Sequence, residues 1–249
     1  MERFWELDSV RGLSVVFMVL FNWSYALHFL EVYSIFPDAS TLYWSFFPKT
    51  IAGSFMLVAG ISLSLSWNRF SETDPSEKEK WKKYVFRGLK IIGLGLGITA
   101  VTWLTFPDYF VFFGILHLLG LSIALSPLVI SDPGKALILS GFVLAIFLFP
   151  ENSSSSVILS SIGVVNPSLN SLDYFPFIPW SAVVFFGIAV GHKVFPGSDR
   201  RFEVERPEKN NLGRLSDFLE LMGRNSLKIY LLHQPLLLSV LMLLGYQVL

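Results

Sequence analysis

Seven apolar stretches divide this chain, and their lengths leave few alternatives to a membrane-spanning bundle. They are Ser9–Phe29, Phe46–Ser66, Tyr84–Trp103, Tyr109–Ile130, Lys135–Pro150, Pro176–Val194 and Ser226–Val248. Most are close to the ~20 residues that a helix needs to cross ~30 Å of hydrocarbon. The fifth and sixth are shorter. The sequence therefore predicts an all-α fold, a polytopic transmembrane helix bundle of about seven spans.

Lysine and arginine fall almost entirely on one side of this bundle. Eighteen of the nineteen lie in the N-terminal arm or in segments that share that side, and only Lys49 lies opposite. Positive charge stays on the cytoplasmic side during insertion, so we expect a cytoplasmic N-terminus and an external C-terminus. The cytoplasmic loops are then about 68–83 and 196–222, and the long external loop is about 151–175. This pattern predicts a multi-pass integral protein of the cell membrane.

Composition agrees with a chain that lies mostly in the lipid bilayer. The 249 residues are 53% hydrophobic and 16% aromatic, with a mean hydropathy of +0.57. These values exceed those of an ordinary soluble domain, so we expect a single integral-membrane domain over 1–249. The net charge is zero and gives no indication of nucleic acid as a partner. Cysteine is absent, which excludes disulfides and thiolate chemistry, and we expect no metal site.

Both predicted cytoplasmic loops have some helical character. The segment SETDPSEKEKWKK alternates charge and predicts a short solvated helix. In the other loop, apolar residues recur at helical spacing and predict an amphipathic helix that lies along the membrane interface and leads into the last span; they are Leu212, Leu215, Phe218, Leu219 and Met222. The glycines of the third span indicate close helix packing rather than a phosphate loop; they are Gly88, Gly93, Gly95 and Gly97.

Polar groups inside the predicted spans are the first candidates for function, because each is costly unless it finds a partner or water. Asn22 is ~20 Å along the first span, and His117 is ~12 Å deep from the external end of the fourth. The two could meet at a similar height in the outer half of the membrane. His117 could act as a base in an apolar pocket. The alternatives are an interhelical hydrogen bond for Asn22 and a packed core histidine for His117.

For other polar residues, too, a structural role is an alternative to a functional one. His28 is either a site residue or an interfacial one, and His192, beside Lys193, is expected to reach the membrane boundary. His233 stands in the phrase YLLHQP, where Pro235 breaks the helix ladder and leaves either a ligand site or a kinked packing site. Arg11 lies in the first turn of its predicted helix, where a cation needs a partner such as a lipid headgroup or a cofactor phosphate.

Six phrases in order carry a resemblance to a known family. They are RFWELDSVRGLSVVFMVLFN, FMLVAGISLSLSWNR, YVFRGLKIIGLGLGIT, FGILHLLGLSIALS, SLDYFPFIPW and the run from Met222 to Leu238 that contains GRNSLKIYLLHQP. In these phrases the chain resembles the membrane acetyltransferase family of heparan-alpha-glucosaminide N-acetyltransferase, and its small prokaryotic members most closely. Only the cytoplasmic loops and the fifth span lack a matching phrase.

The resemblance implies an acyltransferase that passes an acetyl group from cytosolic acetyl-CoA to a hydroxyl or amine, with a sugar as the expected acceptor, at the external face. It implies Arg11, Arg224 and Lys228 near the nucleotide phosphates, and His233 as a further residue that binds the donor. The expected partners are the lipid bilayer, acetyl-CoA and a small-molecule or glycan acceptor. The acceptor's identity and the oligomeric state, with a homo-oligomer as one option, are left open.

The resemblance also suggests roles in the reaction. His117 or His28 would be the general base, Asn22 would hydrogen-bond the thioester carbonyl as the oxyanion forms, and Asp173 would orient the acceptor or the histidine. Asn22 matches an active-site asparagine of the family, whereas the family's catalytic histidine follows the first span at a different spacing. His28 is the nearest residue to it. Small prokaryotic members often have His at the position of Asn22 and Asp at that of Ala26, and this chain departs from both.

Two other classes of function are open at this level. A transporter would show inverted repeats or broken helices at paired positions, and the sequence shows no such pairing. A lipid-binding membrane protein without catalysis would not need Asn22 and His117 at a similar depth. Because a fold does not fix a function, the enzyme remains the preferred hypothesis and the other two remain alternatives.

Overall fold

The structure is a computed structural model that describes residues 4–33, 42–148, 157–163, 170–202, 204–207 and 211–246. Its regular elements within these ranges are helices, and an isolated bridge joins Phe113 to Tyr174. The helices are α1 (Trp5–Phe29), α2 (Phe47–Ser71), α3 (Glu77–Thr105), α4 (Ile115–Leu125), α5 (Pro133–Phe147), α6 (Val157–Ile162), α7 (Phe177–Val194), α8 (Asn211–Arg224) and α9 (Ser226–Leu243). The predicted all-α fold is confirmed for the described chain.

Five helical segments of the described chain are long and apolar enough to cross a membrane. They are Trp5–Phe29, Tyr43–Ser71, Glu77–Thr105, Phe177–Val194 and Ser226–Leu243. Two further apolar helices, Ile115–Leu128 and Pro133–Phe147, are shorter. Five of the seven predicted spans are therefore supported by length and composition, while the other two, and the orientation of both termini, stay predictions.

The fourth predicted span, Tyr109–Ile130, is shorter as a helix because its first residues are not helical. The Leu172 N–H donates to the Tyr109 carbonyl at 3.0 Å, and the Phe175 N–H donates to the Phe113 carbonyl at 2.9 Å. These bonds hold residues 109–113 against a segment about sixty positions later, so the helix begins only at Ile115. Of the predicted external loop 151–175, only 157–163 and 170–175 fall within the described residues.

Local sequence explains where several helices begin. Ser76 caps α3 by accepting from the Glu79 N–H at 3.4 Å, while the Glu79 carboxylate accepts from the Ser76 N–H at 2.9 Å. Charged residues of this segment were predicted to form a separate short helix. Because of the reciprocal capping box, they form the first turns of α3 instead. At α5, Asp132 accepts from the Gly134 N–H at 2.7 Å and Pro133 takes the first helical position, where its missing N–H costs nothing.

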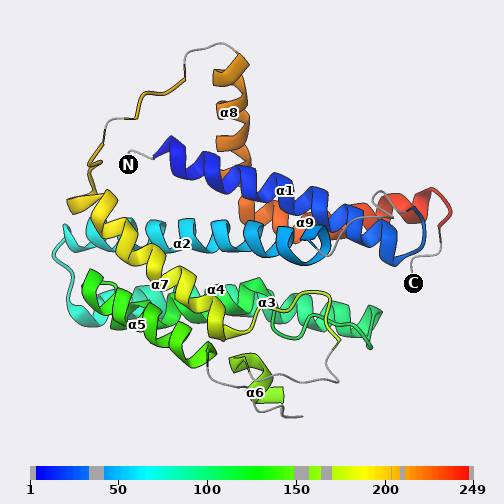
Figure 1. Cartoon of the computed structure of the whole chain (residues 1–249), viewed down its shortest axis with the longest axis horizontal. Coiled ribbons are helices and arrows are strands. Elements are labelled where there is room, and N and C mark those ends of the chain that lie inside the picture. The colour runs from blue at the N-terminus through cyan, green and yellow to red at the C-terminus, as the bar shows by residue number, and fades with distance from the viewer. Residues whose placement is uncertain are drawn as a thin grey trace. The chain divides into compact units, whose positions relative to one another are not determined.

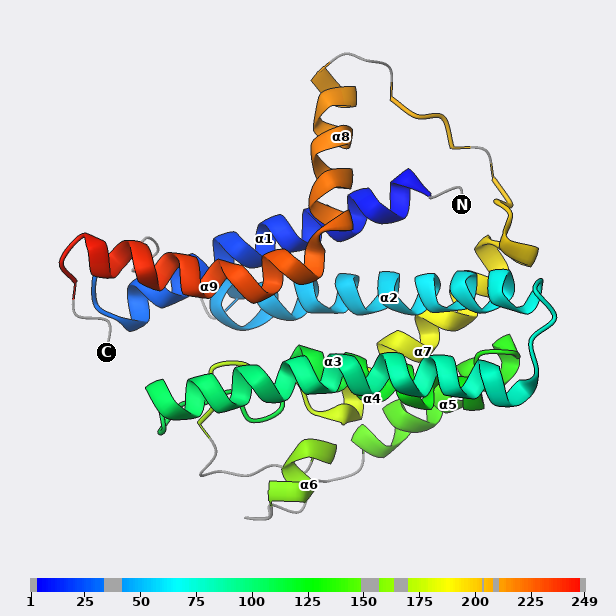
Figure 2. The ribbon, with the colours of Figure 1, turned by 180° about the vertical axis from the view of Figure 1, so that it is seen from behind.

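The chain divides into two compact units, residues 1–58 with 204–249 and residues 59–203. The first unit contains α1, the start of α2, α8 and α9, and here α1 packs against both α8 and α9 (Figure 1). The second contains the rest of α2 and α3 to α7, with α3 against α4 and α5 against α7, as the view from behind also shows (Figure 2). The predicted single domain over 1–249 stays a prediction.

Glycines allow close helix contact within the second unit. A Cβ at Gly88 of α3 would overlap the Gly120 carbonyl and Ala124 of α4, and a Cβ at Gly95 would meet the ring of His117. A Cβ at Gly93 or Gly97 would meet nothing within 4 Å. The packing role predicted for the glycines of this span thus holds at Gly88 and Gly95 only.

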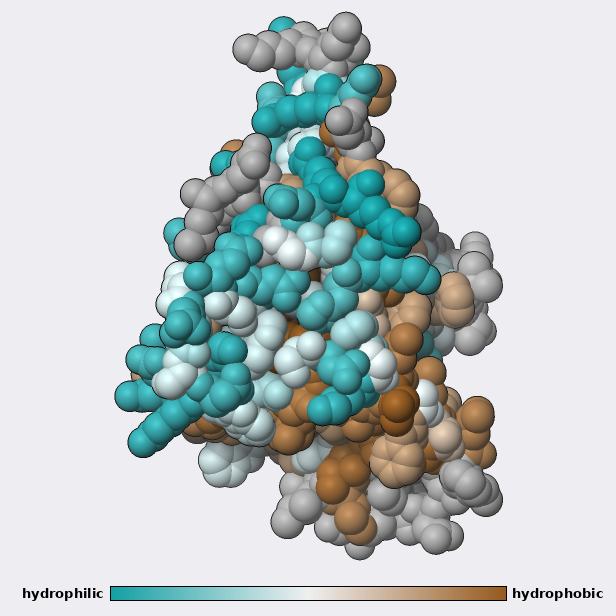
Figure 3. All heavy atoms as spheres, turned by 90° about the vertical axis from the view of Figure 1, so that its left-hand side faces the viewer, coloured by the Kyte–Doolittle hydropathy of each residue, from teal (hydrophilic) through white to brown (hydrophobic). Residues whose placement is uncertain are grey.

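Hydrophilic residues gather where α2 ends and α3 begins. Seen from that side, the surface is largely hydrophilic, with apolar residues toward one edge (Figure 3). The residues there include Arg69, Lys78, Lys80 and Lys82, which belong to the predicted cytoplasmic group of cations. This end of α2 and α3 therefore suits an aqueous surface.

Candidate functional site

His117 lies in the first turn of α4 and is buried, with 5% of its surface exposed. The Gly114 backbone N–H donates to the His117 Nδ1 at 3.3 Å. The other ring nitrogen, Nε2, is also buried and has no hydrogen-bond partner among the described residues. A buried polar atom without a partner is uncommon in folded proteins and calls for an explanation such as an absent ligand or a catalytic role.

The hydrogen bond at Nδ1 determines which nitrogen of the neutral His117 ring carries the proton. A backbone N–H can only donate, so Nδ1 must accept, and in a neutral imidazole the proton then lies on Nε2. The unpartnered Nε2 of His117 therefore presents an N–H donor in this arrangement. A general base must instead present a free lone pair, so this geometry is suited to donating a hydrogen bond.

The pocket around the His117 ring is apolar and closely packed. The Phe113 ring stacks on the imidazole with 5.4 Å between the ring centroids and 29° between their planes. On α3, Gly95 has no side chain, and a Cβ at this position would lie 3.0 Å from the His117 Nδ1 and Cε1. Phe113 and Gly95 thus restrict the orientation of the ring.

Asp173 reaches the same end of α4 from a distant part of the chain. Its Oδ2 accepts from the Ile115 backbone N–H at 3.2 Å, which satisfies one of the free N–H groups of the first helical turn. A carboxylate at this position also interacts favourably with the positive end of the helix dipole. The structure therefore brings Asp173 and His117, both predicted site residues, to the N-terminus of one helix.

Ser171, to which the sequence analysis assigned no role, fixes the loop that carries Asp173. Its hydroxyl accepts from the Phe112 N–H at 3.2 Å and lies 3.0 Å from the Phe110 carbonyl oxygen. With the bridge between Phe113 and Tyr174, these bonds join the loop before α4 to the loop before α7. The position of Asp173 is thus set by two loops.

Asn22 and His28 both belong to α1 in the first unit. The Asn22 Nδ2 donates to the Met18 carbonyl at 2.9 Å, which uses one of its two N–H groups and leaves the other for a ligand. His28 is exposed near the end of α1 and stacks on Trp44, with 5.2 Å between ring centroids. The predicted meeting of Asn22 with His117, which lies in the second unit, stays a prediction.

Aromatic side chains surround this part of α1. Phe21 contacts three rings of the segment that starts α2, with centroid distances of 5.7 Å to Tyr43, 6.0 Å to Trp44 and 6.2 Å to Phe47. The hydroxyls of Ser24 and Tyr43 lie 2.9 Å apart. Stacking and hydrogen bonding thus hold α1 against the start of α2 at the level of Asn22.

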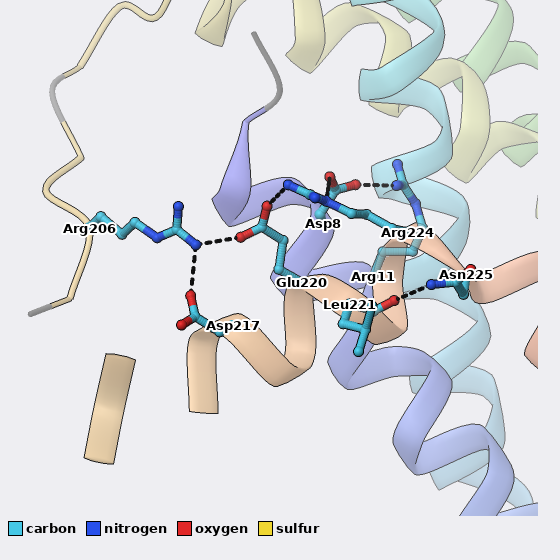
Figure 4. Close-up of polar contacts among 8 residues, drawn as sticks. All are labelled: Asp8, Arg11, Arg206, Asp217, Glu220, Leu221, Arg224 and Asn225. Carbon is cyan, nitrogen blue, oxygen red and sulfur yellow. Dashed lines mark hydrogen bonds and ion pairs between the residues drawn. The ribbon is translucent and has the colours of Figure 1, made fainter. Parts of the chain in front are cut away.

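The arginines predicted to bind phosphate are engaged with carboxylates (Figure 4). The Arg11 Nη1 donates to the Asp8 Oδ1 at 2.7 Å, and the Arg224 Nε lies 3.7 Å from the Asp8 Oδ2. Arg224 also pairs with Glu220. Lys228, the third predicted phosphate ligand, is exposed.

Glu220 is the buried member of this network, and sequence reasoning missed it. Its carboxylate pairs with Arg224 and accepts from the Arg206 Nη2 at 2.8 Å, while Arg206 also reaches Asp217 at 2.7 Å. Its helix packs tightly on α1, since a Cβ at Gly223 would overlap the Asp8 carbonyl and one at Gly12 would overlap the Leu219 carbonyl. In the sequence, the glycines of α8 are the one sign that this face of the helix contacts another backbone.

His233 of α9 is a second buried histidine with an unpartnered nitrogen. It is 7% exposed; its Nδ1 lies 2.7 Å from the Tyr230 carbonyl oxygen, and its Nε2 has no partner among the described residues. A carbonyl can only accept, so Nδ1 carries the proton and Nε2 presents a lone pair. The Trp23 indole donates to the His233 carbonyl at 3.3 Å, which ties α1 to α9 here. The tautomer of His233 is thus opposite to that of His117.

His192 has a packing contact. One of its ring nitrogens lies 2.6 Å from the Ile130 carbonyl oxygen, so the side chain joins α7 to the residues that follow α4. No group of three or more metal-ligating side chains is close enough to hold an ion within the part of the chain that the structure describes.

Comparison with known proteins shows which family this chain belongs to. The family model described as heparan-alpha-glucosaminide N-acetyltransferase, catalytic, matches residues 3–235, which is nearly the whole chain. Curated proteins and solved structures give no match. The matched region includes α1 with Asn22, α4 with His117 and the loop that carries Asp173. The chain therefore belongs to the heparan-alpha-glucosaminide N-acetyltransferase family of membrane acetyltransferases.

Proposed function

We propose that this protein transfers an acetyl group from cytosolic acetyl-CoA to a hydroxyl or amine, with a sugar as the expected acceptor, at the external face of the membrane. Family membership supports acetyl transfer, and the five apolar helices support a membrane location. The distribution of lysine and arginine supports a donor that enters from the cytosol.

The single observation that carries the proposal is the buried Nε2 of His117 at the N-terminus of α4, which has no hydrogen-bond partner among the residues that the structure describes. We assign this nitrogen the role of hydrogen-bond donor to the thioester carbonyl. As the carbonyl oxygen becomes negative in the transition state, a fixed donor in an apolar pocket stabilises it more than water would. Asp173 acts on this step as a positioning residue, because it holds the first turn of α4 and with it His117.

His28 is then the preferred general base, with Asn22 as a second donor to the carbonyl oxygen. His28 is exposed, so a soluble acceptor has access to its ring. It takes a proton from the acceptor hydroxyl or amine, whose oxygen or nitrogen bonds to the thioester carbon. The carbon–sulfur bond then breaks, and the sulfur of coenzyme A leaves and receives the proton. Asn22 retains one N–H for the developing oxyanion after its bond to Met18.

The donor is proposed to contact Arg11, Arg224, Lys228 and His233. Lys228 is exposed and can pair with a nucleotide phosphate directly. Arg11 and Arg224 already pair with Asp8 and Glu220, so they bind phosphate only by sharing their donors with these carboxylates. His233 presents a buried lone pair at Nε2, which suits an amide N–H such as those of a pantetheine arm.

The test is release of coenzyme A by the full chain in nanodiscs, with acetyl-CoA as donor and glucosamine among a panel of amino and hydroxyl sugars as acceptors. Release is read with a thiol reagent, and the protein adds no background because it contains no cysteine. The variants are His117→Ala and His192→Gln; His192 is a half-buried histidine that lies outside the proposed machinery. Calorimetry with acetyl-CoA is run in parallel on Lys228→Ala.

We expect acetyl-CoA-dependent thiol release that falls about 100-fold or more in His117→Ala and is retained in His192→Gln. We also expect weaker binding in Lys228→Ala, with an effect that shrinks as salt rises. Absence of acetyl-CoA binding at millimolar ligand in folded protein would contradict the proposal. That result would favour a transporter or a lipid-binding protein without catalysis.

A further inference from the structure

Helix α8 leaves its apolar residues exposed. Four large apolar side chains spaced three positions apart are between 48% and 66% exposed, and Leu219 and Met222 beside them are only partly buried. The four exposed residues, here called the apolar row, are Leu212, Leu215, Phe218 and Leu221. Residues three and four apart share one side of a helix, so these side chains form a broad apolar surface.

The side of α8 that is buried is small and polar. Gly213, Ser216, Glu220 and Gly223 are buried, and Gly12 and Gly223 bring the backbones of α1 and α8 into contact. A helix of a soluble protein packs its apolar face inward and leaves its polar face outside. In α8 the arrangement is reversed, so contact with α1 does not cover the apolar row.

The attachment of α8 places it at one end of two candidate spans. It meets α1 near Asp8 and Gly12, in the first turns, and it is separated from α9 by Asn225 alone. Both views show α8 running across α1 rather than along it (Figures 1 and 2). A helix that crosses the end of one span and leads directly into another span lies at the boundary between hydrocarbon and water.

The charged side chains of α8 lie at one edge of the apolar row, as Arg214 does, or on the other side of the helix, as Asp217 and Arg224 do. Arg214, Asp217 and Arg224 are exposed, and Arg206 joins Asp217 to the buried Glu220. Lys228 lies in the first turn of α9 and is also exposed. Arginines and a lysine beside an exposed apolar surface match the composition of helices that bind the headgroup layer of anionic membranes.

We propose that α8 lies in the plane of the membrane, at the boundary between headgroups and acyl chains, on the side that holds the first turns of α1. The apolar row enters the acyl region, while Arg214 contacts lipid phosphates. The occupant of this surface is thus phospholipid. The inference is independent of the acetyl-transfer proposal, because it rests on exposure, contacts and chain connection alone.

The natural absence of cysteine makes this surface directly testable. Leu215→Cys, in the apolar row, and Asp217→Cys, on the opposite side of the helix, are each labelled with a nitroxide in the full-length protein. Both residues are exposed, so both labels are expected to be tolerated. The protein is reconstituted in nanodiscs of about three parts phosphatidylcholine to one part phosphatidylglycerol. Electron paramagnetic resonance then compares relaxation by oxygen, which is enriched in lipid, with relaxation by a water-soluble nickel chelate.

We expect the label at position 215 to respond to oxygen several-fold more than to the nickel chelate, and the label at position 217 to show the reverse. Access of nickel to both labels would overturn the proposal by placing α8 in water. Protection of position 215 from both agents would overturn it in favour of a protein contact, such as a second copy of the chain. Labelled Leu221→Cys repeats the measurement six residues further along the helix and excludes a local effect of one label.

Discussion

The Asp173 Oδ2 accepts a hydrogen bond from the Ile115 backbone N–H at 3.2 Å, across 58 positions of sequence. This bond makes Asp173 a cap for α4 that is supplied from another part of the chain. Since His117 lies in the same helical turn, the carboxylate stabilises the segment that holds the proposed oxyanion donor.

Replacement of Asp173 separates its capping role from its charge. Asp173→Ala removes the acceptor for the Ile115 N–H, and loss of a cap costs about 1 kcal/mol. We therefore expect a lower thermal unfolding midpoint and lower activity for Asp173→Ala. Asp173→Asn keeps an oxygen and should unfold close to the wild type. Asp108→Asn, in an exposed loop, is the control. Equal midpoints for all variants would show that the cap contributes nothing.

Substitution of His117 by glutamine tests its role as a donor. The glutamine amide can present an N–H near the position of Nε2 but cannot act as a base. We expect His117→Gln to keep kcat within about tenfold, whereas His117→Ala loses about 100- to 1,000-fold. If glutamine and alanine reduce the rate equally while both proteins stay folded, His117 acts as a base rather than as a donor.

Two glycines of α3 form a matched pair for mutagenesis. A Cβ at Gly95 would lie 3.0 Å from the His117 ring, whereas one at Gly97 would meet nothing within 4 Å. Gly97→Ala should stabilise α3 by about 0.5–1 kcal/mol through higher helix propensity. Gly95→Ala must displace the imidazole, so we expect reduced kcat and no gain in thermal stability. Equal activity in both variants would show that the ring has room to move.

The carboxylates of α8 differ in burial and should differ in energetic effect. Glu220 has a side chain only 7% exposed between Arg206 and Arg224, whereas Asp217 is 60% exposed. Removal of one partner from a buried ion pair costs about 3–5 kcal/mol, and an exposed pair contributes about 0–1 kcal/mol. Glu220→Gln should therefore lower the unfolding midpoint clearly and Asp217→Asn hardly at all. Comparable midpoints would mean that water reaches Glu220.

Sequence patterns were sufficient for the long apolar helices, because hydrophobic length alone identifies them. The start of α4 was not predictable, since hydrogen bonds from the Leu172 and Phe175 N–H groups to the Tyr109 and Phe113 carbonyls keep residues 109–113 out of the helix. A local window contains no information about such distant partners. The helical character of 211–224 was likewise visible in its apolar spacing, and the structure confirms it.

The candidate site was predicted residue by residue but not as an arrangement. His117 and Asp173 were both singled out, yet their convergence on one helix N-terminus depends on the loop fixed by Ser171. Glu220 was missed because a glutamate in an amphipathic helix normally faces water. Its burial follows from the glycines that let α8 touch α1, which is a tertiary contact. The proton positions on His117 and His233 also depend on backbone neighbours.

The contact of Gly12 with α8 connects the proposed membrane-surface helix to α1. Backbone touches backbone there, so α8 cannot slide or tilt without carrying the first turns of α1 with it. Because α1 runs as one helix from Trp5 to Phe29, a displacement at Gly12 would be transmitted along it to Asn22. A change in the thickness or charge of the surrounding lipid that moved α8 would therefore also shift Asn22 in the proposed site.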